Sequence, residues 1–440
     1  MPRSYWVETL GCPKNQVDSD KLEGTLVADG LALAAEPESA DVIVINTCAF
    51  IEAARQESID TILAFDARRQ AGSRLVVTGC LAERYQQELV DALPEVDLVA
   101  PFGTALLEQA DDGNRSVPMS VPVSIGAGPR ARTATGALPA PSFDLLNLPR
   151  PPARGPWAYV KVAEGCDRNC GFCAIPSFRG KQRSRPVADV LAEIDGLGVK
   201  EVVLVAQDLA SYGRDQGQGQ RSLVPLLSQL VGRVDWVRLL YLYPSDLTNE
   251  LIDAICATGV PYFDLSLQHV SAPLLRRMRR WGDGDRFLRR IGDIRARQPD
   301  AAFRTNFIVG YPGETEDHHD ELLRFIEAAQ LDWCGFFAYS PEEGTYATSL
   351  DGDVPSGLVA QRLYELRQLQ DDITAAKRDE LIGSELKVLV ERTGVARSFR
   401  EAPEIDGIIE VPDTLAVGRF ATVEVVDAQG TDLVARPVAQ

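Results

Sequence analysis

The sequence predicts a mixed α/β fold: an N-terminal parallel α/β sheet domain, a central partial (β/α)6 barrel and a small C-terminal all-β domain. Strand-like apolar runs alternate with helix-like stretches over residues 1–105 and again over 157–339, a pattern typical of parallel sheets. After residue 383 only short strand-like runs remain. The expected units are 1–115 (N-terminal domain), 116–151 (linker), 152–380 (barrel) and 381–440 (C-terminal domain).

Three strand-like runs, each followed by a helix, predict the N-terminal domain. The runs are 5–9, 42–45 and 75–78, and the helices begin near residues 16, 52 and 82. Cys12, Cys48 and Cys80 follow the strands at spacings of 36 and 32 residues, each about one βαβ unit. The three thiols should therefore meet at the carboxyl edge of one sheet, where α/β folds bind ligands.

Nearby helix N-termini would favour the thiolate form of these cysteines. Burial of three small residues is the alternative interpretation, but their shared topological position favours a metal site. An iron–sulfur cluster is favoured over zinc, because no fourth ligand is apparent and the histidines come only at positions 269, 318 and 319.

A proline-rich stretch separates the first two domains. Nine of the 27 prolines lie between Pro118 and Pro156, which indicates a partly extended linker. Barrel strands are then expected at 158–163, 201–206, 236–243, 262–267, 302–310 and 333–339. Helices are expected at 187–196, 222–231, 249–258, 285–297, 315–330 and 356–381. Six such units predict a partial parallel barrel with its active face at the strand C-termini.

Cys166, Cys170 and Cys173 form one block, C-D-R-N-C-G-F-C, directly after the first barrel strand. A closed structural metal site needs four ligands. Three thiolates in one loop therefore leave a coordination position open, and in an iron–sulfur cluster the open iron could hold a small molecule.

Polar residues at the other strand ends describe a pocket around this loop. Gln207, Gln268 and Asn306 are candidate ligand contacts, and His269 is a candidate either for an active-site role or for a local hydrogen bond. Turns and helix caps are the alternative for such residues; Thr315, for example, is well placed to cap a helix.

Some further residues carry weaker signals. Cys256 and Cys334 are interpreted as small core residues. The basic run of Lys181, Arg183 and Arg185 is either a solvated face or a contact to an acidic cofactor group.

Composition limits the partners. Net charge is −19, which argues against nucleic acid as the main partner and for a basic one, although solubility alone is the alternative. The C-terminal 58 residues, 383–440, carry six Lys or Arg and ten Asp or Glu, a net charge of −4. Three further short strands are expected there, at 386–391, 407–411 and 421–426.

Neither a membrane nor export is expected to be involved. No run of 18 or more apolar residues predicts a transmembrane helix, and the N-terminus lacks the features of a signal peptide. The eight cysteines should therefore be reduced, in the cytoplasm. Nothing in the sequence demands more than a monomer.

The block C-x-x-x-C-x-x-C, with the aromatic Phe172 before Cys173, resembles the signature of radical S-adenosylmethionine (SAM) enzymes. The contexts L-G-C-P-K-N, I-N-T-C-A-F-I and V-T-G-C-L around the upstream cysteines resemble the methylthiotransferase branch, as do L-Q-H-V-S, F-I-V-G-Y-P-G-E-T-E and Y-S-P-E-E-G-T. In L-Q-H-V-S, Val270 stands where small residues often occur. The terminal β domain resembles a TRAM module.

Two branches of that family fit. One modifies an adenosine in transfer RNA; the other, the RimO type, modifies the β-carbon of an aspartate in a small-subunit ribosomal protein of the S-twelve type. The segments E-A-P-E-I-D-G and V-A-Q-D-L-A-S-Y-G resemble the RimO type. The acidic terminal domain agrees with a basic ribosomal protein as substrate.

The resemblance implies two [4Fe–4S] clusters and SAM as cofactors. Cys166, Cys170 and Cys173 would hold the catalytic cluster, which would bind SAM and cleave it to a 5′-deoxyadenosyl radical. Phe172, Gln207, Gln268 and Asn306 would line the cofactor site.

Cys12, Cys48 and Cys80 would hold an auxiliary cluster that delivers sulfur, while a second SAM supplies the methyl group. A flavodoxin- or ferredoxin-type protein would donate low-potential electrons, and the terminal domain would dock the substrate. A two-cluster electron-transfer protein and a zinc-stabilised scaffold are the alternatives from other classes.

Overall fold

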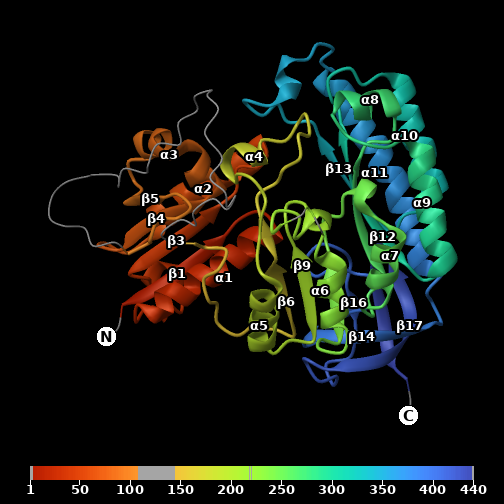
Figure 1. Cartoon of the computed structure of the whole chain (residues 1–440). Helices are drawn as coiled ribbons and strands as arrows, with labels where there is room; N and C mark the ends of the chain where they lie inside the picture. Colours follow the sequence, from red (N-terminus) through yellow and green to blue (C-terminus); the bar gives the residue numbers. More distant parts are fainter. Residues whose placement is uncertain (1–2, 108–143, 218, 220, 439–440) are drawn as a thin grey trace.

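The computed structural model describes residues 3–107, 144–217, 219 and 221–438. Figure 1 shows the N-terminal sheet domain on one side, the six strands of the central unit in the middle, and the C-terminal β domain below it. Most of the expected linker, 116–143, lies outside the described residues. None of the helices in the described ranges combines the length and apolarity that a membrane crossing requires.

The N-terminal domain is a five-stranded parallel sheet in the order β2-β1-β3-β4-β5. Its strands are β1 (Ser4–Thr9), β2 (Ala32–Leu33), β3 (Val42–Thr47), β4 (Arg74–Gly79) and β5 (Leu98–Ala100). Its helices are α1 (Pro13–Ala28), η1 (Pro37–Ser39), α2 (Glu52–Arg68) and α3 (Cys80–Ala92). The three predicted strands are confirmed; β2 and β5 are too short to give a sequence pattern.

The central unit consists of two three-stranded parallel sheets, β10-β9-β6 and β11-β12-β13, joined by a bridge between Leu242 and Leu265. The six strands are β6 (Trp157–Lys161), β9 (Glu201–Val205), β10 (Trp236–Leu239), β11 (Tyr262–Gln268), β12 (Ala302–Val309) and β13 (Trp333–Ala338). β10 ends four residues before the predicted position 243. The reason is that Tyr241 adopts a φ of +66°, which ends the extended conformation.

Helices cover the outer face of this unit, and α9, α10 and α11 lie together on one side in Figure 1. The helices are α4 (Ile175–Phe178), α5 (Val187–Leu197), α6 (Leu223–Leu230), α7 (Asn249–Cys256), α8 (Ala272–Arg277), α9 (Gly284–Arg297), α10 (Glu316–Ala329) and α11 (Ser356–Asp379), with short turns η2 (Leu209–Ser211), η3 (Pro244–Asp246) and η4 (Tyr346–Ser349). Thr315 caps α10 as expected, with its side chain accepting from the His318 amide. The short helices α4 and α8 were not predicted, because four and six residues are too few to show a helical period.

The C-terminal domain is a closed barrel in the order β14-β15-β16-β18-β17. Its strands are β14 (Glu385–Arg392), β15 (Val395–Arg397), β16 (Ile409–Glu410), β17 (Phe420–Gln429) and β18 (Asp432–Pro437). A two-stranded pair, β7 (Ala163–Glu164) with β8 (Arg183–Ser184), flanks the cysteine loop of the central unit.

The segment 398–406 of the C-terminal domain closes the end of the central unit where the strands begin. Ala402 is fully buried there, in one apolar cluster with Trp236 and Tyr262. The Tyr159 hydroxyl donates to the Pro403 carbonyl at 2.9 Å, and the Tyr262 hydroxyl donates to the Asp406 carboxylate at 2.6 Å. Segment 401–407, whose sequence E-A-P-E-I-D-G resembles the RimO type, is therefore largely buried. It lies at the end of the central unit opposite to the strand ends that carry the cysteine loop.

Candidate active site

The first barrel strand delivers the cysteine loop. β6 continues into β7, and the loop then runs from Gly165 through Cys166, Cys170 and Cys173 to α4. Gly165 has a φ of +77°, and a Cβ there would lie 2.6 Å from the Lys181 carbonyl carbon, so only glycine fits this entry to the loop.

Backbone contacts hold the middle of the loop. The Gly171 amide donates to the Met278 carbonyl at 2.8 Å, and the Gly171 carbonyl accepts from the Ala347 amide at 2.8 Å. A Cβ on Gly171 would meet the Tyr311 hydroxyl at 2.7 Å. Segments after β11 and β13 therefore position the loop across the strand ends.

Two arginines lie against the cysteines of this loop. Arg280 Nη1 donates to Cys170 Sγ at 3.2 Å, and the Arg168 amide donates to Cys166 Sγ at 3.4 Å. The two guanidinium groups lie 3.8 Å (Arg168) and 4.3 Å (Arg280) from the centre of the Tyr243 ring. The Arg168 guanidinium is ion-paired with Asp208 at 2.6 Å and with Asp246, so the charged group in contact with a cysteine sulfur is that of Arg280.

In the chain without clusters, burial favours the neutral thiol form of these cysteines over the thiolate. It raises the pKa of Cys166 to about 11 and that of Cys173 to about 12. Since a cysteine binds iron as the thiolate, loading this loop releases protons and should be favoured by higher pH.

The second trio lies at the carboxyl edge of the N-terminal sheet, as predicted. Cys12 precedes α1, Cys48 follows β3, and Cys80 begins α3. The strands β1, β3 and β4 are neighbours in register, so these positions lie side by side. A Cβ on Gly11 would lie 2.9 Å from Cys48 Sγ, which shows how closely the trio's backbone is packed.

Electrostatics differ among these three thiols. Burial raises the pKa of Cys48 to about 12. Burial also acts to raise the pKa of Cys12, but the charges of Lys14 and Arg179 and two backbone amides outweigh it and lower the pKa overall. Lys14 itself lies 3.5 Å from the centre of the Tyr241 ring, so the strained Tyr241 approaches this edge from the central unit.

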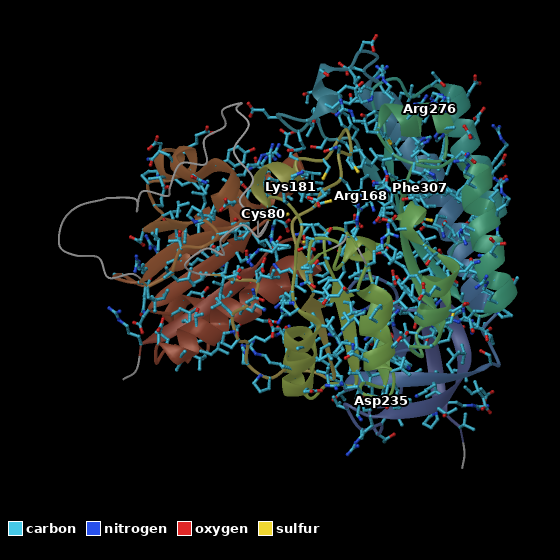
Figure 2. The ribbon with its side chains drawn as sticks, viewed as in Figure 1. Cys80, Arg168, Lys181, Asp235, Arg276 and Phe307 are labelled. Carbon is cyan, nitrogen blue, oxygen red and sulfur yellow. The ribbon has the colours of Figure 1, made fainter. Side chains whose placement is uncertain are left out.

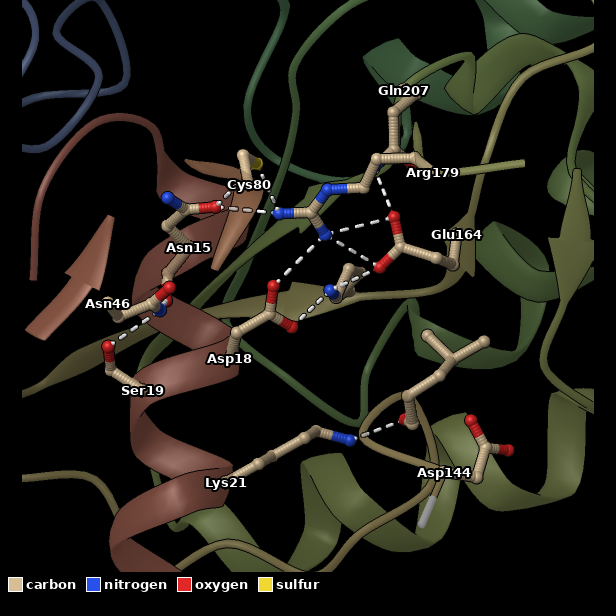
Figure 3. Close-up of polar contacts among 12 residues, drawn as sticks. Asn15, Asp18, Ser19, Lys21, Asn46, Cys80, Asp144, Glu164, Arg179 and Gln207 are labelled. Carbon is tan, nitrogen blue, oxygen red and sulfur yellow. Dashed lines mark hydrogen bonds and ion pairs between the residues drawn. The ribbon is translucent and has the colours of Figure 1, made fainter. Parts of the chain in front are cut away.

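Arg179 joins the two cysteine regions. Its Nη2 donates to Cys80 Sγ at 3.0 Å and to Asn15 Oδ1 at 2.8 Å, and its Nη1 donates to Glu164 Oε2 at 2.9 Å and to Asp18 Oδ2 at 3.1 Å. Figure 3 shows this guanidinium between the N-terminal helix and the Glu164 carboxylate. In Figure 2, the labelled Cys80 and Arg168 lie near each other, where the N-terminal domain adjoins the central unit.

The acidic partners of Arg179 share one more cation. Lys161 forms ion pairs with Asp18 and, at 2.6 Å, with Glu164. Although burial opposes ionisation of Glu164, the charges of Arg179 and Lys161 hold the pKa of its carboxyl well below the usual range. The Glu164 carboxylate is therefore ionised across the physiological pH range.

The predicted rim residues have distinct surroundings. Gln207 Nε2 donates to Glu164 Oε1 at 2.5 Å, while Gln207 Oε1 is buried without a hydrogen-bond partner among the described residues. Asn306 Oδ1 is likewise buried and unpartnered in that part of the chain. Gln268 ends β11 with a φ of +71°, and Phe172 packs against the central apolar core.

His269 is packed inside the central unit, and its Nε2 is buried without a hydrogen-bond partner among the described residues. Its Nδ1 accepts from the Ser271 amide at 3.1 Å, and it is fully buried. Burial, and the neighbouring charges of His318, His319 and Arg362 from the α10 and α11 side, lower its pKa to about 3. The local-hydrogen-bond interpretation fits His269.

The remaining candidates make contacts within the chain. Arg183 pairs with Asp144 at 2.7 Å, and the buried Arg185 pairs with Glu193 at 2.8 Å, whereas Lys181 is exposed. Cys256 and Cys334 pack against the central core.

Sequence reasoning missed Arg179, Lys161, Asp18, Arg280 and Tyr241. Each is a common residue type inside a predicted helix, strand or loop, so nothing in the local sequence sets it apart. Its role depends on contacts with residues far along the chain. The single available signal was Glu164 directly before the cysteine block.

The donor set fits iron–sulfur clusters. Each trio offers three thiolates. In a four-iron cluster each cysteine binds one iron, so a trio would bind three of the four irons. In the described part of the chain, no three His, Cys, Asp or Glu side chains are grouped to hold a single metal ion. The unpartnered acceptors of Gln207 and Asn306 suit a bound molecule with N–H or O–H donors.

Three family models match the chain. "Uncharacterized protein family UPF0004" matches residues 4–101, "Radical SAM superfamily" matches 160–326, and "TRAM domain" matches 382–438.

Relatives match over nearly the whole length. A protein of Cutibacterium acnes, "Ribosomal protein uS12 methylthiotransferase RimO", is 42% identical over 466 residues, which cover 98% of this chain and 97% of that protein. A protein of the same name from Moorella thermoacetica is 44% identical over 428 residues, 95% of each chain. The chain belongs to the RimO family.

As a RimO-family member, the chain is a radical SAM methylthiotransferase, with SAM and [4Fe–4S] clusters as cofactors. Solved structures are less similar to it. The radical SAM methyltransferase TsrM of Kitasatospora setae has a TM-score of 0.48 and 16% identity, over 77% of this chain and 74% of that one. The family assignment therefore depends on the full-length relatives.

Proposed function

We propose that the protein methylthiolates the β-carbon of an aspartate in ribosomal protein uS12, with the catalytic cluster on Cys166, Cys170 and Cys173 and the auxiliary cluster on Cys12, Cys48 and Cys80. The observation that carries the two-cluster reaction is Arg179, which touches both Cys80 and Glu164, two residues before Cys166. The two trios therefore belong to one site.

The bound clusters would supply the electron that cleaves SAM and the sulfur that is transferred. The chain's own residues position these groups. Arg280 compensates the negative charge of the catalytic thiolates, the Arg168 amide donates to Cys166 Sγ, and Gln207 and Asn306 present acceptors to SAM. Gln268 and Phe172 complete the proposed cofactor contacts. The strands β9 and β10 of the central unit are buried at every position and help to keep water from the reacting centre.

The substrate assignment is supported by the names of the full-length relatives and by the net charge of −19, which suits a basic protein. A flavodoxin- or ferredoxin-type donor, a monomeric state and a cytoplasmic location complete the proposal.

The cysteine assignment is tested by iron content and SAM cleavage. The chain should bind about eight irons, four per cluster. A variant with Cys166, Cys170 and Cys173 all changed to alanine should bind about four irons and lose SAM cleavage. Cys12→Ala should still release 5′-deoxyadenosine but form no methylthiolated product. Full cleavage by the triple variant would contradict the assignment.

The substrate is tested by mass spectrometry of uS12 and of bulk transfer RNA from a deletion strain. Loss of the modification from uS12, with transfer RNA unchanged, is expected. The opposite result would assign the chain to the modification of adenosine in transfer RNA.

A further inference from the structure

We infer that Arg179 is a positioning residue that ties the Cys80 ligand of the auxiliary cluster to the base of the catalytic loop and raises the reduction potential of that cluster. The inference rests on the proposed cluster assignment and adds a residue to it.

The first step is the location of Arg179 in the chain. Glu164 stands two residues before Cys166, and Arg179 follows α4, which begins two residues after Cys173. The Glu164–Arg179 ion pair therefore closes the base of the loop that carries all three catalytic cysteines. Any shift of Arg179 must move one end of that loop.

The second step is the bond to sulfur. Within the described ranges, Arg179 is the only charged side chain that donates a hydrogen bond to a sulfur of the N-terminal trio. Arg179 is buried and the Cys80 side chain is also buried, so water does not compete for this contact. A hydrogen bond to a cluster ligand stabilises the more negative, reduced state, which raises the reduction potential.

The third step is the shape of the group. A guanidinium is a planar fork, so one edge can serve Cys80 and Asn15 while the other serves Glu164 and Asp18. An ammonium group has a single nitrogen and cannot span both sides. Lysine at this position therefore keeps the charge that balances the two carboxylates but loses one set of contacts.

The test uses the variant in which Cys166, Cys170 and Cys173 are alanine, so that only the auxiliary cluster is present. In this background, Arg179→Lys should shift the midpoint potential of the cluster, followed by electron paramagnetic resonance during a redox titration, to a more negative value. Iron should stay at about four per chain. Arg185→Lys is the matched control, because Arg185 is also buried and ion-paired but contacts no cysteine, and it should leave the potential unchanged.

A second variant covers the case in which Arg179→Lys loses its iron. Glu164→Gln removes the competing carboxylate, so Arg179 should bind Cys80 more strongly and the potential should rise. Where Arg179→Lys keeps its iron, adding Glu164→Gln to it should have no further effect, since the coupling runs through Arg179.

The outcomes separate two failures. If the background variant binds no iron at Cys12, Cys48 and Cys80, the cluster assignment fails. If iron is bound and neither Arg179→Lys nor Glu164→Gln moves the potential, the role of Arg179 is wrong. In the otherwise unchanged chain, Arg179→Lys should raise the ratio of 5′-deoxyadenosine to methylthiolated product; an unchanged ratio would contradict the coupling.

Discussion

At the residue scale, a candidate residue could be judged from the sequence only when its role does not depend on contacts with residues far along the chain. The six cysteines could be grouped into two trios from their spacing alone, because Cys12, Cys48 and Cys80 each follow a strand of one sheet and the other three share one loop; their role as cluster ligands stays a prediction. His269 could not be judged this way, since its position after a strand is compatible with either face. Its burial beside His318 and Arg362 is a property of the packed helices.

The low pKa of His269 makes stability depend on pH. In the folded chain His269 stays neutral down to a pKa of about 3, whereas the unfolded chain takes up a proton near pH 6.5. The unfolded state therefore binds more protons between these values, so stability falls as pH falls below 6.5. At pH 5 the loss from this group is about 2 kcal/mol.

His269→Asn keeps an acceptor for the Ser271 amide but does not titrate in this range. Urea unfolding at pH 5 and pH 7.5 should show a smaller difference for this variant than for the parent chain. Equal differences in the two proteins would contradict the assignment of a neutral, buried His269.

At the element scale, the long strands followed from continuous apolar runs, because strands such as β3 and β9 are buried at every position between layers of helices. The exceptions are short. β10 stops at Leu239 because of the strained Tyr241, and α4 and α8 have too few residues to show a period. The loop at 165–174 has no period either, and packing alone determines its shape.

A substitution at Gly165 tests whether packing determines the conformation of this loop. Gly165→Ala places a Cβ against the Lys181 carbonyl group at a φ of +77°, so the loop must move. We expect a loss of stability of about 2 kcal/mol or more and impaired iron loading at the adjacent Cys166. Thermal unfolding and iron analysis measure the two effects.

Gly196→Ala is the control for this substitution. Gly196 lies in α5 with open space around its Cα, so alanine should be neutral or stabilising there. Normal iron content in Gly165→Ala would show that the loop tolerates the displacement.

At the scale of the whole molecule, ion pairs join the N-terminal domain to the central unit at several places, among them Lys21 with Glu193 at 3.2 Å. One is the Arg179 network. A second is Glu342, after β13, whose carboxylate accepts from Arg55 Nη1 at 2.5 Å and from Arg84 Nη1 at 2.7 Å. Arg84 also donates to the Ala49 carbonyl, next to Cys48.

Glu342→Gln should weaken this second contact. The Glu342 side chain is 2% exposed, and its removal leaves two partly buried arginines without their counter-charge. The expected loss is roughly 2–3 kcal/mol, with faster hydrogen exchange in α2 and α3. Glu343→Gln, at an exposed neighbouring position, should change neither quantity; equal effects of the two variants would refute the contact's role.

The sequence by itself determined the layer architecture and most of the long strands, because apolar runs and their spacing are local; the two cysteine trios stay a prediction from that spacing. Only the tertiary structure decided that Arg179 meets Cys80, that segment 398–406 closes the barrel, and that His269 is buried near charges of α10 and α11. These contacts join residues about 50 to 250 positions apart. Their energies depend on desolvation and on exact approach, which no local pattern records.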